Sequence, residues 1–404
     1  MGNEFLKRMQ WMEQFSSRMQ LKAAGMLVHE QFSYFQDYIS GNKERFVWTN
    51  MLMPPELLYG AGLIPLQTEL IAGWLSSLKL SQYYIQKAHS AGWSSNICSY
   101  HKAVIGALEA GILPAPRIAV FSSHLCDGGN LIARYLKQKY ETKVFVLEVP
   151  YGKDNPGSLL RVKKQIEDTI ELLEDYKKEN ISLQMLQNAI RLSNEGSCLL
   201  QKANQLRASK YLFEGYLAIR NMYGASFLLG SEQGVKIAAS YFEQLKQKEE
   251  ICDTYARILW IHFAPLYDGE LMSTFENELG MKIVFDITGH IYWKELDIEN
   301  IVSALAKKML SHFFTGNFNG RKVFYEKIIE EYQINGIVLF QHQNCRAISC
   351  SSWELREVSK NLHIPYLEIS GDCIDSGTYA KEQIRLRMEA FAERFLDYHQ
   401  NPME

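Results

Sequence analysis

Three cysteines of this chain stand in loop-like stretches, and thiolates are residues that can bind a metal centre. Cys98 lies in NICSYHK, Cys126 in SSHLCDGGN and Cys345 in QHQNCRAIS, and none of them belongs to an apolar run. Thiolates prefer soft metals and iron–sulfur clusters. Three of them at one place would leave one coordination position open. This pattern favours a catalytic iron–sulfur cluster over a storage or structural one.

Two of the three cysteines follow segments that have the composition of β-strands. RIAVFSS (117–123) precedes Cys126, and INGIVLF (334–340) precedes Cys345. In open α/β sheets, ligands bind beyond the carboxyl ends of the strands. We therefore expect both loops to lie where a cofactor binds.

The same cysteines also fit a structural interpretation. A free cysteine often behaves as a small buried hydrophobic residue. The chain has no CxxC pair, so no local spacing of the zinc or ferredoxin type supports a metal site. The remaining four cysteines are interpreted as structural: Cys198, Cys252, Cys350 and Cys373.

Composition is that of an ordinary globular protein. The chain has 404 residues, 47% hydrophobic and 22% charged, with a net charge of −3. This length predicts two or three domains, and the charge gives no reason to expect nucleic acid or a membrane surface as a partner. No apolar run approaches the roughly 18 residues of a spanning helix, and the N-terminus lacks the apolar region of a signal peptide. We expect a cytoplasmic protein.

The periodicity predicts an α/β fold with two doubly wound parallel-sheet domains. Residues 1–45 form a helical N-terminal arm, 46–157 the first α/β domain, 158–250 a helical insert, and 251–404 the second α/β domain. Alternation of strands and helices is what predicts parallel sheets. A metal centre held by all three cysteines would then lie in the cleft between the domains, a common place for ligand sites.

Individual elements follow from the same patterns. In the first domain we expect a short strand, a helix that begins at Pro55, a strand near 63–66, a helix from Cys98 to Gly111, a strand over 117–123, a helix over 131–139 and a strand over 143–150. In the second domain we expect strands over 256–263, 281–288, 334–340 and 363–370, with helices over 271–280 and 379–399.

Several of these segments, in this order and spacing, resemble the 2-hydroxyacyl-CoA dehydratase family, which also contains benzoyl-CoA reductase subunits and double-cubane cluster proteins. The resemblance runs from about residue 47 to 396. It depends on PPELLYGAGLIPL (54–66), CSYHKAVIGALEAG, RIAVFSSHLCDGGN, INGIVLFQHQNC and the closing segment 364–395.

The resemblance implies a [4Fe–4S] cluster bound by Cys98, Cys126 and Cys345. It also implies a related second subunit (a heterodimer, with a homodimer possible), an ATP-dependent iron–sulfur activator protein, and an acyl-CoA substrate. The implied reaction removes water from an (R)-2-hydroxyacyl-CoA to give a 2-enoyl-CoA through a ketyl radical. The alternatives are a subunit of a benzoyl-CoA reductase and a non-catalytic electron-relay subunit. A double-cubane cluster needs about twice as many cysteine ligands, and Cys198, in a helical stretch, argues against it.

Two further residues are candidates for catalysis. Glu56 in PPELLYGAG matches a recurring family position and could act as a base or bind the substrate hydroxyl; the alternative is a carboxylate that stabilises a helix N-terminus. His124 could hydrogen-bond the cluster or the substrate, or could cap the helix that follows. His342 and Asn344 could tune the cluster through hydrogen bonds, or could be ordinary loop residues.

Overall fold

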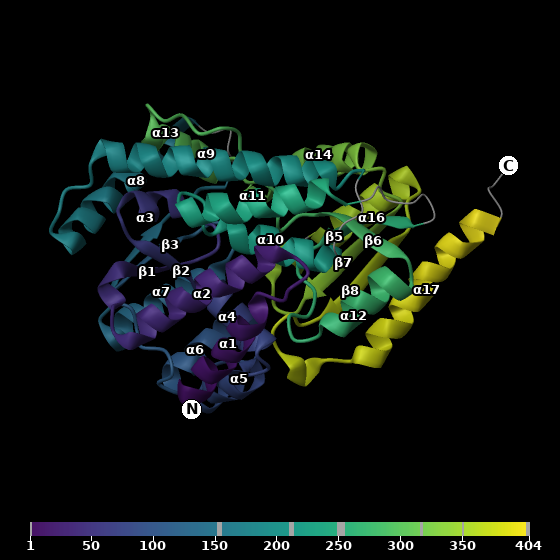
Figure 1. Ribbon diagram of the computed structural model, residues 1–404, viewed down its shortest axis with the longest axis horizontal. Coiled ribbons are helices and arrows are strands. Elements are labelled where there is room, and N and C mark those ends of the chain that lie inside the picture. The colour runs from purple at the N-terminus through teal and green to yellow at the C-terminus, as the bar shows by residue number, and fades with distance from the viewer. Residues whose placement is uncertain are drawn as a thin grey trace.

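Two four-stranded parallel sheets form the framework of the protein (Figure 1). The computed structural model describes residues 2–151, 156–209, 214–248, 255–315, 318–349 and 351–400. The first sheet has the order β2-β1-β3-β4, with strands β1 (Phe46–Thr49), β2 (Ile64–Gln67), β3 (Ile118–Ser122) and β4 (Lys143–Leu147). The second has the order β6-β5-β7-β8, with strands β5 (Ala256–Ile261), β6 (Met281–Asp286), β7 (Gly336–His342) and β8 (Tyr366–Gly371).

The two sheets repeat one topology. In each, the first strand along the chain pairs with the second and the third, and the fourth strand pairs with the third. All of these pairs are parallel, so the carboxyl ends of neighbouring strands lie at one edge of each sheet. The predicted fold class, two doubly wound α/β units, is confirmed.

Helices cover both sheets and connect them. The N-terminal arm consists of α1 (Gly2–Ser16) and α2 (Lys22–Ser40). The first half contains α3 (Pro55–Gly60), α4 (Thr68–Ser77), α5 (Ser81–Ser90), α6 (Ser99–Glu109) and α7 (Asp127–Tyr140). Then follow α8 (Pro156–Lys177), α9 (Leu183–Leu206), α10 (Gly215–Ser226) and α11 (Glu232–Lys246). The second half contains α12 (Gly269–Ser273), α13 (Ile301–Leu310), α14 (Phe318–Glu331), α15 (Arg346–Ser349), α16 (Ser351–Leu362) and α17 (Lys381–Gln400).

Two predicted helices have different bounds in the structure. Helix α7 begins at Asp127 rather than at residue 131, because Cys126 occupies the N-cap position. The helix expected over 271–280 is α12 followed by a π-helical turn, Thr274–Glu278. That turn directs the Glu276 carboxylate inward, where it accepts hydrogen bonds from the backbone N–H groups of Gly215 and Tyr216. The contact of Glu276 with the first turn of α10 thus accompanies π-helical rather than α-helical geometry over Thr274–Glu278.

One apolar core joins the two halves. A single cluster of buried side chains contains Trp48 and Phe121 from the first sheet and Trp260 and Phe340 from the second. Full burial of a large apolar side chain contributes roughly 1.5–3 kcal/mol. The halves are therefore held together by their cores as well as by the connecting helices.

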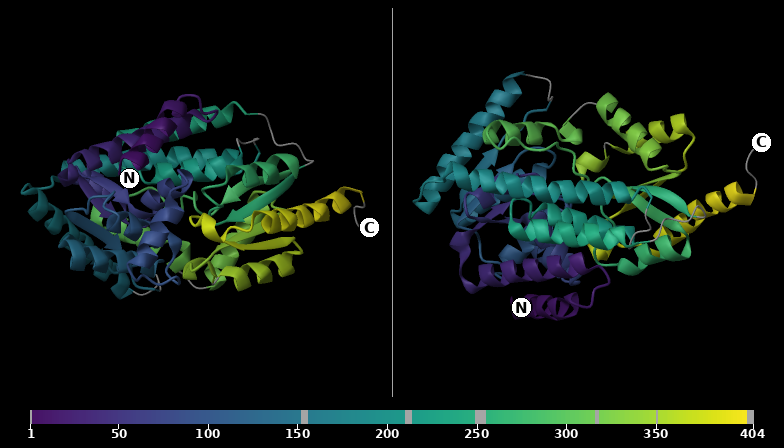
Figure 2. Two further views of the ribbon diagram at one scale, coloured as in Figure 1. Left: turned by 90° about the horizontal axis from the view of Figure 1, so that it is seen from below. Right: turned by 45° about the horizontal axis from the view of Figure 1, so that its top comes forward.

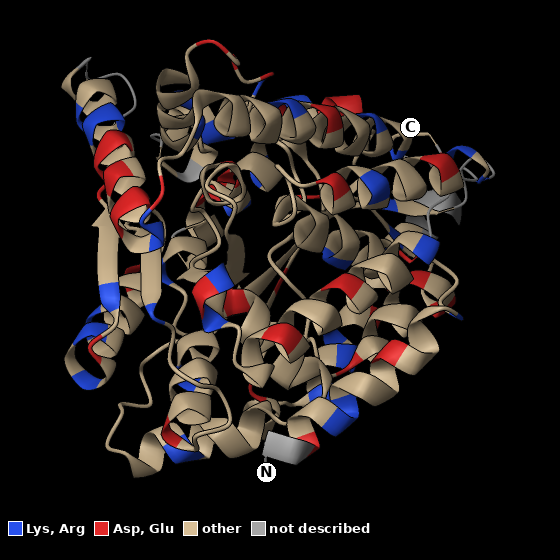
Figure 3. Ribbon diagram, turned by 60° about the vertical axis from the view of Figure 1, so that its left-hand side comes forward, with Lys and Arg blue, Asp and Glu red and all other residues tan. Residues whose placement is uncertain are grey.

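The connecting helices extend across the molecule. Figure 1 shows α9 and α11 running side by side from the first sheet toward the second, and the two helices pack against each other. Although α13 follows the second sheet's β6, it packs against α8. The views of Figure 2 place the N-terminal arm along the first half and α17 at the far end of the second sheet. In the view of Figure 3, acidic and basic residues are interspersed along the surface helices.

Within the described part of the chain, every helix is too short or too polar to span a lipid bilayer.

Candidate functional site

A pocket of about 410 Å³ lies where the carboxyl ends of strands from both sheets meet. Cys98, Cys126 and Cys345 all line this pocket. Loops that follow β1, β3, β5, β6 and β7 supply most of the remaining wall. The fold therefore brings together three residues that are far apart in the sequence, at the position that a parallel α/β sheet offers to a ligand.

Each of the three cysteines stands at the start of a helix. Cys98 is the N-cap of α6, Cys126 is the N-cap of α7, and Cys345 directly precedes α15. Backbone N–H groups at a helix N-terminus favour negative charge, and thiolates are stabilised there. For Cys126, the nearby N–H groups of Gly128 and Gly129 lower the pKa of the thiol.

Burial has the opposite effect on the same thiols. It raises the pKa of Cys126 to about 11 and that of Cys98 well above its usual value. The charges of Cys126 and Cys345 raise the pKa of Cys98 further, so the three sulfur atoms lie near one another. Three neighbouring thiolates need a positive centre to remain ionised, and a metal cofactor provides one.

A residue with a positive φ angle directly precedes two of these cysteines. Leu125, with φ 76°, precedes Cys126, and Asn344, with φ 63°, precedes Cys345. Positive φ is uncommon outside glycine and costs about 1–3 kcal/mol at such a residue. A residue with positive φ, followed by a cysteine, thus occurs after β3 and after β7, which hold corresponding places in the two sheets.

Histidine rings contact two of the sulfur atoms. His342 Nε2 lies 3.2 Å from Cys98 Sγ, and His101 Nε2 lies 3.3 Å from Cys126 Sγ. The Cys373 backbone N–H donates to His342 Nδ1 at 3.0 Å, so the proton of the neutral ring is on Nε2 and His342 donates to the Cys98 sulfur. Gly128 makes room for the second contact, since a Cβ there would lie 1.9 Å from the His101 ring.

The loop that carries Cys98 is attached to the second half of the molecule. The Ser99 hydroxyl donates to Asp372 Oδ1 at 2.6 Å, and the N–H groups of Ile374 and Asp375 donate to the same oxygen. Asp372 is buried in the turn that follows β8. This bond holds the first turn of α6 in place relative to the second sheet.

Glu69 is a carboxylate in the pocket wall that the sequence interpretation did not single out. It is the second residue of α4, it is buried, and its Oε1 has no hydrogen-bond partner within the described structure. Burial raises its pKa. Glu69 lies just beyond the carboxyl end of β2, and this position after a strand could have marked it as a candidate from the sequence alone.

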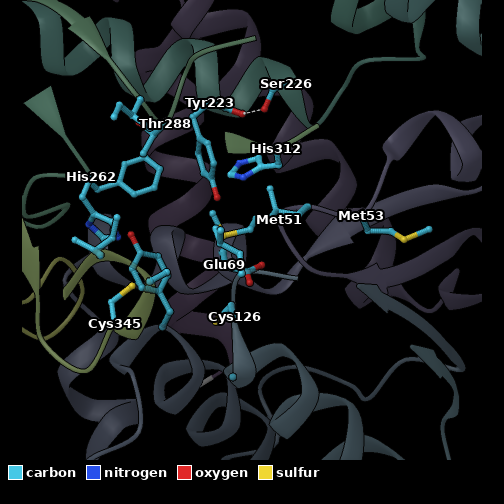
Figure 4. Close-up of a pocket in the computed structure, with 18 of the residues that line it drawn as sticks. Met51, Met53, Glu69, Cys126, Tyr223, Ser226, His262, Thr288, His312 and Cys345 are labelled. Atoms are coloured by element: carbon cyan, nitrogen blue, oxygen red, sulfur yellow. Dashed lines mark hydrogen bonds between the residues drawn. The ribbon is translucent and has the colours of Figure 1, made fainter. Parts of the chain in front are cut away.

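The hydroxyl of Tyr223 lies close to Glu69. It too is buried, lines the pocket and has no hydrogen-bond partner in the described part of the chain. Burial and the charges of Glu69 and Cys126 raise its pKa well above the usual value. Figure 4 shows Tyr223 directed toward the part of the pocket where Glu69 and Cys126 lie. Two polar groups therefore remain available to a ligand beside the thiols.

Glu56, predicted as a catalytic candidate, is buried in the first turn of α3. Its Oε1 accepts hydrogen bonds from Lys308 Nζ and from the Ser193 hydroxyl, both at 2.6 Å. Among the described residues that line the pocket, Lys308 is present and Glu56 is not. The structure thus gives Glu56 a partner from α13, and its catalytic role stays a prediction.

His124 is buried next to the pocket wall rather than in it. Both of its ring nitrogens are without a hydrogen-bond partner in the described structure, and its ring faces that of His312 at 6.2 Å. Burial lowers its pKa to about 3, so the ring is neutral. Its predicted role in catalysis also stays a prediction.

The other cysteines have different environments. Cys198 is exposed on α9, and Cys373 is buried with its sulfur 3.3 Å from the Phe263 carbonyl oxygen. The charge on Cys373 would interact with Cys98 and Cys345, so it lies near the site without lining the pocket. Cys252 and Cys350 lie outside the described residues.

Three cysteine thiols that line one pocket are a donor set suited to an iron–sulfur cluster. Over the described ranges, no three His, Cys, Asp or Glu side chains are arranged closely enough to hold one metal ion. In a [4Fe–4S] cluster each thiolate binds a different iron, so the sulfur atoms stand further apart than around a single ion. Three thiols around one pocket fit that requirement.

Three known proteins are similar to this chain over most of its length. The chain is 20% identical over 374 residues to the (R)-phenyllactyl-CoA dehydratase alpha subunit of Clostridium sporogenes, covering 87% of this chain and 89% of the relative. It is 19% identical over 364 residues to the (R)-2-hydroxyisocaproyl-CoA dehydratase alpha subunit of Clostridioides difficile, covering 86% and 89%. It is 22% identical over 360 residues to a benzoyl-CoA reductase subunit of Thauera aromatica, covering 78% and 80%.

A family model gives the assignment. The model described as 2-hydroxyglutaryl-CoA dehydratase, D-component, matches residues 50–395, a span that includes all three pocket cysteines and every strand of the two sheets except β1. The chain therefore belongs to the 2-hydroxyglutaryl-CoA dehydratase D-component family.

Proposed function

We propose that this protein is the iron–sulfur subunit of a 2-hydroxyacyl-CoA dehydratase, which converts an (R)-2-hydroxyacyl-CoA to the 2-enoyl-CoA. The observation that carries the proposal is the convergence of Cys98, Cys126 and Cys345 on one pocket. That pocket also holds a carboxylate oxygen, Glu69 Oε1, and the phenol of Tyr223, neither of which has a hydrogen-bond partner in the described structure. The family and the dehydratase subunits among its relatives support the same reaction.

The three cysteines would hold a [4Fe–4S] cluster. When bound, such a cluster would supply a low-potential electron for the thioester carbonyl and a Lewis-acidic iron to assist loss of the 2-hydroxyl. His342 donates a hydrogen bond to Cys98 Sγ and holds that sulfur in place. The helix N-termini at Cys98 and Cys126 stabilise the thiolates.

Glu69 and Tyr223 are the residues that would act on the substrate. After the hydroxyl leaves, the β-proton becomes acidic enough for a carboxylate to remove it, and Glu69 Oε1 is free to accept that proton. The Tyr223 hydroxyl can donate a hydrogen bond to a substrate oxygen. Burial raises the pKa of Glu69 and makes it a stronger base than an exposed carboxylate.

A second subunit and an activator are included in the proposal. The relatives of this chain are themselves named as subunits, which supports assembly with a related second chain. An ATP-dependent iron–sulfur protein would deliver the initiating electron, which returns at the end of each turnover.

A subunit of an aryl-CoA reductase is the second candidate. The similarity to the benzoyl-CoA reductase subunit of Thauera aromatica favours it, and a reductase would use the same thiols and the same pocket. The two candidates differ in electron balance, since dehydration consumes no net electrons and ring reduction consumes two.

Reductant stoichiometry tests the proposal. The cluster-loaded protein, its second subunit, the activator, ATP and a low-potential reductant should convert a 2-hydroxyacyl-CoA with far less than one electron consumed per product. Cys126→Ala should lose iron and activity together, whereas Cys198→Ala, on the exposed face of α9, should keep both. Two electrons per product with an aryl-CoA would contradict the dehydratase and favour the reductase.

A further inference from the structure

Beyond the cysteines, the pocket is walled mainly by apolar and aromatic side chains. These come from the segment after β1, from α10 and from the loops after β5 and β6: Leu52, Met53, Phe227, Phe263, Ile287, Ile291, Trp293. An acyl chain that enters this space would exchange water for hydrocarbon at roughly 25 cal/mol per Å² of buried apolar surface.

The buried cation in the wall is already neutralised. Lys308 Nζ donates to Glu56 Oε1 at 2.6 Å, and both side chains are buried. The ring of Trp293 covers the ammonium group at 3.8 Å from the ring centroid. The charge of Lys308 is therefore matched by a carboxylate and shielded by an indole, and a second carboxylate in the pocket would find no counter-charge there.

Other basic groups around the pocket do not change this balance. Arg346 pairs with Asp127 at 2.8 Å, and both side chains are largely exposed, 85% and 72%, so water screens their charges. Burial lowers the pKa of two pocket histidines, His262 and His312, to about 3, so these rings are neutral. The Glu69 carboxylate lies in the pocket wall near the His101 ring and adds repulsion for an incoming anion.

We propose that the pocket accepts an apolar, uncharged acyl chain and rejects acyl-CoA esters that carry a second carboxylate. This inference rests on the proposed function, and it separates the protein from a dehydratase of 2-hydroxyglutaryl-CoA, whose acyl chain ends in a carboxylate. Lys308 is the residue that would recognise such a group, and the bond to Glu56 prevents it from doing so.

Binding of unreactive esters tests this selectivity without turnover. The probes are 4-methylpentanoyl-CoA, glutaryl-CoA and free CoA, titrated calorimetrically into the cluster-loaded protein. We expect 4-methylpentanoyl-CoA to bind at least about tenfold more tightly than glutaryl-CoA. Equal or tighter binding of glutaryl-CoA would overturn the inference and leave the dehydratase intact. Failure of both esters to bind better than free CoA would overturn the proposed function as well.

A single substitution should reverse the preference. Glu56→Gln removes the charge that neutralises Lys308, so glutaryl-CoA should bind at least about tenfold more tightly than to the unchanged protein, with little effect on 4-methylpentanoyl-CoA. Glu354→Gln is the matched control, because it also removes the buried carboxylate partner of a basic side chain, Arg321, outside the pocket. The same gain in both variants would contradict the role of Lys308. The wild-type affinity ratio decides the inference even if Glu56→Gln fails to fold.

Discussion

Two buried carboxylates of the first half, Glu56 and Glu69, show how surroundings determine what a residue can do. Glu56 is ion-paired with Lys308 and bound by Ser193. Glu69 accepts a hydrogen bond from Thr68 through one oxygen, while the other oxygen is unpartnered within the described structure. Glu56 also has one oxygen, Oε2, without a hydrogen-bond partner in the described structure, but its ion pair with Lys308 makes it a poor base. Glu69 lines the pocket and is the carboxylate available for proton transfer.

We predict that Glu69→Gln slows dehydration by roughly 10²–10⁴-fold, the usual contribution of a general base. The amide keeps the shape of the side chain, so iron content and the visible spectrum should not change. Steady-state rates and iron analysis of the purified variant provide the measurement. Glu109→Gln, which alters a carboxylate paired with Lys139 outside the pocket, is the control. Full activity in Glu69→Gln would refute the assignment.

The sequence identified the thiols of this site more readily than its carboxylate. Cys126 and Cys345 follow strands, and that placement was readable from the order of residues. Glu69 also follows a strand, β2, but it lies in a helical segment, where its sequence context does not separate it from other helical glutamates. The Glu56–Lys308 pair joins residues 252 positions apart, so only the folded chain reveals that Glu56 is occupied.

The N-termini of helices α6, α7 and α15 position the three thiols. Cys98 and Cys126 are N-caps, and Cys345 precedes α15, so three helices direct their N-termini at one pocket. The Cys98 helix depends on one more contact, the bond from Ser99 to the buried Asp372. Loss of that donor leaves the carboxylate with backbone partners alone.

Ser99→Ala should therefore weaken both the fold and the cluster site. A hydrogen bond to a charged group contributes about 1.5–3 kcal/mol, and we expect the free energy of unfolding to fall by an amount of that size. Iron should also be lost to a chelator faster than from the unchanged protein. Urea unfolding and the rate of iron release measure the two effects. Ser90→Ala, at an exposed hydroxyl on α5, should alter neither. Unchanged iron release in Ser99→Ala would contradict the positioning role of this bond.

The strands of both sheets were predicted from periodicity, whereas helices α4, α5, α13, α14 and α16 were not singled out. Two of the predicted helices differ from the structure for tertiary reasons. Helix α7 starts at Asp127 because Cys126 caps it. The π-helical turn at Thr274–Glu278 exists because Glu276 binds the first N–H groups of α10, some sixty residues earlier in the chain. Local sequence patterns contain no information about such partners.

At the scale of the whole molecule, the two halves act as one body around the pocket. They share an apolar core, and α13 returns from the second half to pack on α8. The segment after α13 carries His312, whose ring lies 6.2 Å from that of His124 from the first half. A neutral histidine thus lies buried where the two halves meet, and protonation there would place a charge in an apolar, aromatic setting.

This burial makes stability depend on pH. Burial lowers the pKa of His312 to about 3, against about 6.5 in an unfolded chain. Between these values the unfolded state binds the extra proton, so the stability provided by the neutral ring is complete above pH 6.5 and is lost as the pH falls toward 3. One proton corresponds to about 1.4 kcal/mol per pH unit, which amounts to about 2 kcal/mol between pH 7 and pH 5.

His312→Phe should remove this dependence while keeping an aromatic ring beside Tyr292 and Phe313. Anaerobic urea unfolding at pH 7 and at pH 5 gives the change in the free energy of unfolding for each protein. We expect the variant to lose about 2 kcal/mol less than the unchanged protein over that range. His29→Phe, which alters an exposed histidine paired with Glu13, is the control and should keep the larger loss. If His312→Phe lost as much stability as the unchanged protein, the His312 ring would already be protonated in the fold at pH 5, and the junction between the halves would be wetter than its packing indicates.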